Sequence, residues 1–140
     1  MVNLETLANK LQRGTEWQKT PETLYLEDYC ELMHTALKQL FIVTGRASVY
    51  DESKLVVEDD MPIAYDDTLQ VDEVEWIMVT AEIGFFRKVQ TDVNNTFGYS
   101  TDALTVTNAD KPYQNLASTI QKLEYTQRLL YYKMARFNLL

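Results

Sequence analysis

The chain has 140 residues, one cysteine and a net charge of −8, from 21 acidic and 13 basic side chains. A chain of this length buries about two thirds of its unfolded surface, enough for one core without cross-links, and the lone Cys30 excludes an intrachain disulfide. The sequence has neither the pattern of a signal peptide at its N-terminus nor an apolar run of about 20 residues, so we expect no export signal and no membrane span.

The first two predicted elements are helices joined by a short connection. The first, over residues 3–13, has Asn3 as its candidate N-cap. The second is predicted to open at Thr20-Pro21, because a capping hydroxyl followed by proline is typical of a helix start, and to end at Gly45. Apolar side chains recur along it at intervals of three and four: Leu26, Tyr29, Cys30, Met33, Leu37, Leu40 and Phe41.

An acidic segment follows, in which the helical period is lost. Two short β-rich runs, Lys54–Glu58 and Ile63–Tyr65, are separated by acids and by Pro62. They predict a small hairpin or an irregular arm over residues 48–67, and Pro62 argues against a central strand because proline cannot donate a backbone hydrogen bond. The acids of this arm are Asp51, Glu52, Glu58, Asp59, Asp60, Asp66 and Asp67.

Two more helices complete the chain. The third, from about Asp72 to Val93, is apolar on two sides, which predicts a central helix buried between neighbours. The last is predicted to open at Pro112 and to end near residue 138, within a C-terminal segment of 112–140. Its predicted core seam alternates steps of four and three: Leu116, Ile120, Leu123, Gln127, Leu130, Met134 and Phe137.

These elements predict one mainly α domain over residues 1–140, a four-helix bundle-like fold with a small β-rich arm or hairpin between helices two and three. Beyond Leu123 the last helix carries rings and aliphatic groups outside its seam. A small domain covers one face of such a helix end, so the surplus predicts a contact with another chain. The candidate partner-binding residues are Tyr125, Arg128, Leu129, Tyr131, Tyr132, Lys133, Arg136, Phe137, Leu139 and Leu140.

Charge is unevenly distributed along the chain. The segment 51–75 holds ten acids and one lysine, whereas the segment 111–140 holds five bases and one glutamate. Two interpretations stay open: opposite charges attract copies of the chain head to side, or the acidic surface serves solubility.

Catalytic and metal sites are poorly supported. Cys30 and His34 are spaced to share a helix face, but no other cysteine or histidine exists to complete a zinc site, so we expect a buried thiol beside a boundary histidine and no metal or cofactor. The pairs Asp59-Asp60 and Asp66-Asp67 lie in a solvated run, and no glycine-rich phosphate loop is present. We therefore expect no enzymatic activity; an enzyme using His34 or the acid pairs is the alternative.

Three segments carry a resemblance to a known family: FFRKVQTDVNN (85–95), YSTDALTVTNADKPY (99–113) and LEYTQRLLYYKM (123–134). With a short first helix, a long second, a buried third and an aromatic C-terminal helix, the chain resembles the head–tail connectors or adaptors of the neck of tailed bacteriophages. The arm at 48–67 and the loop at 98–110 exceed the compact pattern of that family.

The resemblance implies a structural protein of the virion neck, made in the host cytoplasm. It implies a homo-oligomeric ring, often twelve-fold, whose C-terminal helix binds the portal protein while a tail-side neck protein binds below. DNA would pass through the channel of the ring, and the arm's acids would line that channel or contact a neighbouring subunit. From the residues alone, a helical regulatory or binding domain that dimerises without forming a ring is the alternative.

Overall fold

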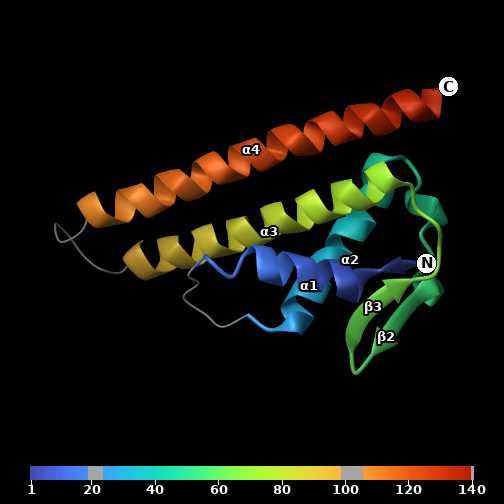
Figure 1. The fold of residues 1–140 in the computed structure, drawn as a ribbon, viewed down its shortest axis with the longest axis horizontal. Coiled ribbons are helices and arrows are strands. Elements are labelled where there is room, and N and C mark those ends of the chain that lie inside the picture. Colours follow the sequence, from blue (N-terminus) through green and yellow to red (C-terminus); the bar gives the residue numbers. More distant parts are fainter. Residues whose placement is uncertain (19–23, 99–105, 140) are drawn as a thin grey trace.

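The computed structural model describes residues 1–18, 24–98 and 106–139, and the side chains of these residues except 92–98, 106–115 and 135–139. The protein is mainly helical, with a small antiparallel sheet between the second and third helices, as the sequence predicts (Figure 1). The described residues form four α-helices, α1 (Leu4–Gly14), α2 (Leu26–Val43), α3 (Val71–Gly98) and α4 (Val106–Leu139), and three strands, β1 (Val2–Asn3), β2 (Leu55–Glu58) and β3 (Met61–Tyr65).

The predicted N-cap of the first helix is confirmed. The Asn3 side-chain oxygen accepts a hydrogen bond from the Thr6 backbone N–H at 2.9 Å, which satisfies one of the unpaired donors at the start of α1. The helix buries Leu4, Ala8 and Leu11, the apolar side of an otherwise polar element.

The end of α2 was predicted correctly and its start was not. At the end, Gly45 adopts a φ of 75°, and the Arg46 N–H bonds back to the Phe41 carbonyl at 2.8 Å, which is a Schellman closure. Thr20 and Pro21 lie outside the described residues, and α2 begins at Leu26 instead. An aspartate capping contact decides this start, because the Asp28 carboxylate accepts the Tyr25 N–H at 2.8 Å.

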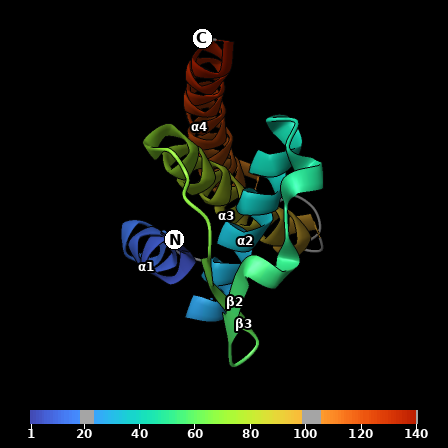
Figure 2. The ribbon, with the colours of Figure 1, turned by 90° about the vertical axis from the view of Figure 1, so that its right-hand side faces the viewer.

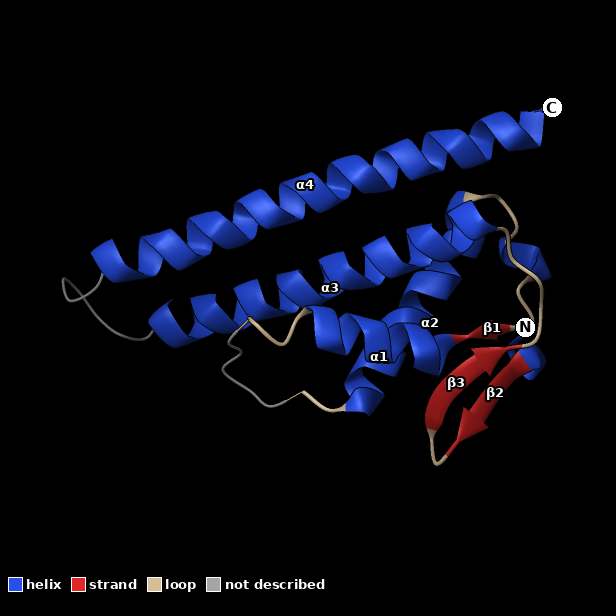
Figure 3. Ribbon diagram, viewed as in Figure 1, coloured by secondary structure: helices blue, strands red, loops and turns tan. Residues whose placement is uncertain are grey.

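The predicted hairpin is confirmed, but its second strand is central, not peripheral. The sheet has the order β1-β3-β2, with β3 in the middle (Figure 3). The N-terminal strand β1 pairs only with Ala64 and Tyr65 of β3. Pro62 lies beyond that short pairing and faces Val57 of β2, beside an irregularity of register. The missing N–H of Pro62 therefore costs the sheet no bond on the β1 side.

The hairpin turn holds two aspartates in the left-handed region, Asp59 at φ 52° and Asp60 at φ 61°. Glycine suits the second position of such a turn better, because its backbone has no Cβ to crowd. We expect Asp60→Gly to raise the free energy of unfolding by about 0.5 kcal/mol and Asp60→Ala to lower it by about 0.5–1 kcal/mol. Urea denaturation checks both. Since both variants lose the same charge, equal effects would contradict a backbone explanation.

An aromatic cluster fixes the base of the hairpin to the helices. Tyr50 and Tyr65 stack with ring centroids 5.5 Å apart, and Phe41 of α2 meets both rings edge-on. Tyr65 is fully buried, and its hydroxyl accepts the Asp51 N–H at 3.2 Å. The Tyr65 end of the hairpin is thus part of the core, whereas Val56, Val57 and Glu58 of β2 are exposed.

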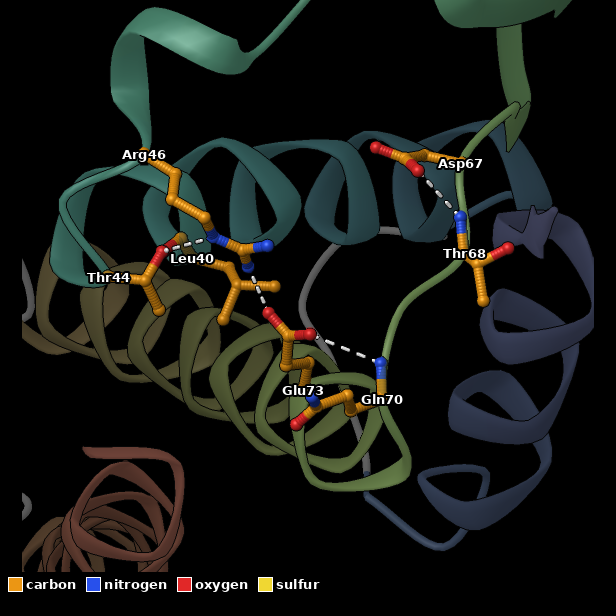
Figure 4. A network of polar contacts seen from close by, with 7 residues as sticks. All are labelled: Leu40, Thr44, Arg46, Asp67, Thr68, Gln70 and Glu73. Atoms are coloured by element: carbon orange, nitrogen blue, oxygen red, sulfur yellow. Dashed lines mark hydrogen bonds and ion pairs between the residues drawn. The ribbon is translucent and has the colours of Figure 1, made fainter. Parts of the chain in front are cut away.

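A polar network joins the end of α2 to the start of α3 (Figure 4). The Thr44 hydroxyl donates to the Leu40 carbonyl at 2.7 Å and accepts from Arg46 Nε at 3.2 Å. Arg46 also pairs with Glu73, a buried carboxylate, whose other oxygen accepts the Gln70 N–H at 3.1 Å. Glu73 therefore caps α3 and binds Arg46 at once.

The third helix is central, as predicted, and packs against α1, α2 and α4. Gly84 permits its close approach to α2, because a Cβ there would lie 3.2 Å from Leu32 Cδ2. The predicted end near Val93 is too early, since the helical backbone continues to Gly98. Asparagine lowers helix propensity only slightly, so Asn94 and Asn95 do not suffice to stop a helix.

The last helix begins earlier than predicted. Its backbone is helical from Val106, which places Pro112 in the second turn and not at the first helical position. A proline there removes one backbone hydrogen bond near the N-terminal end of α4, and the helix continues after it to Leu139. Of the loop predicted over 98–110, residues 99–105 lie outside the described part.

Candidate protein-binding surface

The last helix lies along α3 at the outside of the molecule. Figures 1 and 2 show α4 antiparallel to α3, and α3 is the helix against which it packs. The predicted seam faces α3: Leu116, Ile120, Leu130 and Met134 are buried, and Leu123 and Gln127 are half-buried. The side chain of Phe137 lies outside the described set. Sequence periodicity therefore located the inner face of α4 correctly.

Two polar contacts fix how α4 sits on α3. Gln127 Nε2 donates to the Thr80 hydroxyl at 2.8 Å, and Thr80 is buried. Arg87 pairs with Glu124 at 2.6 Å, nearer the solvent. Gln127 is the polar member of the predicted seam, and its partly buried bond to Thr80 favours one register between α4 and α3.

The outer face of α4 leaves its predicted partner-binding rings in solvent. Tyr125 is 59% exposed, Leu129 45%, Tyr131 39% and Tyr132 62%. Arg128 and Lys133 are exposed between them. Arg136, Phe137 and Leu139 follow on the helical backbone, but their side chains lie outside the described set, as does all of Leu140. Among the described elements α3 is the main neighbour of α4, and these side chains stay exposed on the far side of the helix.

Two grooves follow the sides of α4. The α2–α4 groove, of about 630 Å³, is lined by Gln39, Ile42, Val43, Trp76, Gln127, Arg128, Tyr131 and Tyr132. The α3–α4 groove, of about 550 Å³, is lined by Glu75, Met78, Val79, Thr126, Leu129, Leu130, Tyr132 and Lys133. Tyr132 lines both grooves, so they adjoin at this ring on the C-terminal half of α4. Exposed apolar side chains gathered beside grooves are typical of sites of protein contact.

Sequence reasoning missed the contribution of α2 to this surface. Ile42 is 64% exposed and Val43 40%, at the last turn of α2. Their run Phe41-Ile42-Val43, directly before Thr44, was a usable signal, because one helix face can bury only part of three consecutive apolar residues. Trp76 of α3, which is buried, also lines the groove.

The acids of the arm lie apart from α4. In Figures 1 and 2 the β2–β3 hairpin and α4 lie on opposite sides of the molecule. Six of these acids are exposed: Asp51, Glu52, Glu58, Asp59, Asp60 and Asp66. Asp67 is half-buried, and its carboxylate lies 3.9 Å from Lys54 Nζ. Hydrogen bonds from the Ser53 hydroxyl and N–H lower the pKa of the Asp51 carboxyl. A channel-lining or subunit-contact role for these acids stays a prediction.

Cys30 and His34 are both buried on α2. Cys30 is fully buried, and burial raises the pKa of its thiol to about 11, so it stays protonated. His34 Nε2 shares a hydrogen bond of 2.8 Å with the Tyr50 hydroxyl. The described residues contain no cluster of three or more His, Cys, Asp or Glu side chains able to hold a metal ion.

The buried His34 makes stability depend on pH. Burial, with Lys38 nearby, lowers the pKa of His34 below its ordinary value of 6.5. The unfolded chain therefore takes up a proton on His34 at a higher pH than the folded chain does. The stability that neutral His34 contributes is fully present above pH 6.5 and is lost as the pH is lowered through that value. Urea midpoints measured across this range check the prediction. His34→Gln, which keeps a partner for Tyr50, is expected to flatten the dependence; an unchanged slope would contradict it.

Comparison with protein-family models, with curated proteins and with solved structures finds no match for this chain. Among the helices that the structure describes, none is long and apolar enough to cross a membrane. The site must therefore be interpreted from its own geometry and chemistry.

Proposed function

We propose that this chain is a non-enzymatic assembly protein, a head–tail connector that forms a ring in the neck of a tailed bacteriophage and attaches to the portal. The observation that carries the proposal is the C-terminal half of α4, which buries one seam on α3 and leaves its tyrosines and Leu129 in solvent. The segments that resemble neck proteins, 85–95, 99–113 and 123–134, give the proposal its specific form.

The composition of this surface supports protein binding. Tyrosine and arginine dominate the energetics of protein interfaces, because they combine a large apolar area with a polar tip. Tyr131 and Tyr132 contact each other edge to face, with ring centroids 6.0 Å apart. This contact holds the two rings in place before a partner binds. The grooves on both sides offer space for a partner's side chains.

In this proposal the end of the chain inserts into the portal, with Arg136, Phe137, Leu139 and Leu140 as its contact residues. Neighbouring copies complete the ring, and a tail-side neck protein binds its other side. The acids at Asp51, Glu52, Glu58, Asp59, Asp60, Asp66 and Asp67 then face either a neighbour or the DNA channel, where negative charge would let DNA slide without adhering.

A triple substitution on α4 tests the proposal. Tyr125→Ser, Leu129→Ser and Tyr132→Ser remove exposed side chains, so each is expected to change the free energy of unfolding by no more than about 0.5 kcal/mol. We expect the triple variant to fold normally and to lose ring formation and portal binding. Electron micrographs, light scattering and co-sedimentation with portal protein measure these properties.

A matched control removes exposed apolar groups elsewhere. Tyr25 and Val49 are 63% and 56% exposed and lie outside both grooves, so Tyr25→Ser with Val49→Ser should assemble like the wild type. Normal assembly of the α4 variant would refute the proposal. The second candidate, a dimerising domain, is favoured by the same exposed face. It predicts two-fold dimers without rings or portal affinity.

A further inference from the structure

The two grooves beside α4 differ in charge. Among the side chains that the structure describes, Arg128 is the one charged residue lining the α2–α4 groove, whereas the α3–α4 groove holds both Glu75 and Lys133. Arg128 is exposed and has no ion pair among the side chains that the structure describes. The α2–α4 groove therefore combines apolar walls with an uncompensated positive charge, which favours an occupant that is apolar and acidic.

The tip of the β2–β3 hairpin has that chemistry. Val56 and Val57 are 37% and 54% exposed on β2, and Glu58, Asp59 and Asp60 follow directly and are exposed. Within the described part of the chain these three carboxylates have no ion pair. In the described sheet β2 is the outer strand, so one of its edges pairs with no other described strand.

The hairpin of one copy does not lie on that copy's own groove. The hairpin and α4 occupy opposite sides of the molecule in both views (Figures 1 and 2). The aromatic packing of Tyr65 against Phe41 and Tyr50 fixes the base of the hairpin to the body, so the tip is held in place. A hairpin can thus meet a groove only on a different copy, in a head-to-tail contact that generates a ring when its rotation closes.

We infer that the α2–α4 groove receives the β2–β3 hairpin of a second copy of this chain. Val56 and Val57 pack against Ile42, Val43 and the ring of Tyr131, and the tip acids lie against Arg128. This inference rests on the proposed function and names the surfaces through which the ring closes. The α3–α4 groove and the last turns of α4 remain for the portal.

Charge exchange between the two surfaces tests the contact. The first variant, Arg128→Glu, makes the groove acidic. The second, Glu58→Lys with Asp59→Asn and Asp60→Asn, makes the hairpin basic while keeping residues that tolerate the left-handed turn. Lys10→Glu and Glu16→Lys, at exposed positions on and after α1, are the matched controls. Sedimentation velocity at low and high salt measures self-association, and circular dichroism checks the fold.

We expect the wild type and the controls to self-associate, and to do so more weakly at high salt. Each charge variant alone is expected to self-associate at least about tenfold more weakly than the wild type. A mixture of the two variants should recover association, because each hairpin then finds a groove of opposite charge. A basic-hairpin variant that associates like the wild type, or a mixture that stays monomeric, overturns the inference. A wild-type chain that is monomeric at every concentration does so too. The proposed function fails separately, if the triple α4 variant still forms rings and binds the portal.

Discussion

Phe85→Ala is expected to lower the free energy of unfolding by about 3–5 kcal/mol, the largest effect of any single substitution considered for this protein. Phe85 is fully buried in α3, stacks on Tyr29 of α2 at 5.8 Å and meets Phe86 edge-on at 5.1 Å. Its removal deletes apolar contacts and leaves a cavity where α2 and α3 pack, which the rigid helices cannot close.

Thermal and urea denaturation measure this effect. For a chain of this length the melting temperature should fall by about 10–20 °C. Val71→Ala is the matched control on the same helix, because Val71 is 74% exposed and should change stability little. A loss below about 1 kcal/mol for Phe85→Ala would mean that the α2–α3 contact is not packed as described.

Arg46→Ala is expected to destabilise the fold by about 2–3 kcal/mol, because it leaves the Glu73 carboxylate buried without its cation. The effect lies below that of a fully buried pair, since the Arg46 side chain is 40% exposed and water can partly replace it. The substitution also removes the guanidinium packed over the Phe41 ring, 5.1 Å from its centroid.

A second variant separates the buried charge from lost packing. In Arg46→Ala with Glu73→Gln, the amide oxygen still accepts the Gln70 N–H, but no charge is left unpaired. Chemical denaturation should show that the double variant recovers at least half of the lost stability. If the double variant is as unstable as Arg46→Ala, the stabilisation comes from Arg46 packing on Phe41 and Thr44 and not from the ion pair.

Local signals in the sequence predicted part of the fold well. Asn3 and Gly45 work as predicted because a cap depends on only a few neighbouring residues. The predicted helix starts at Thr20-Pro21 and Pro112 were wrong. The Asp28 contact marks the start of α2, and α4 begins at Val106, before Pro112. How typical a start signal is does not decide where the helix begins, because most of the stability of a helix comes from the packing of its whole length.

The position of β3 shows a limit of a different kind. Pro62 argued against a central strand, and this prediction is wrong for β3, because β1 pairs with Ala64 and Tyr65, further along the strand. β1 comes from the first three residues of the chain, about 60 positions away. Nothing near Pro62 in the sequence could indicate that this partner exists.

The sequence by itself determined that the last helix has more apolar surface than one seam can bury, since helical periodicity assigns each side chain of a single helix to a face. Only the tertiary structure decided what surrounds that surface. It joins Ile42 and Val43 of α2 to Tyr131 of α4 in one groove, and it holds the acidic hairpin on the opposite side. Both depend on contacts between segments far apart in the chain, which no local pattern of residues specifies.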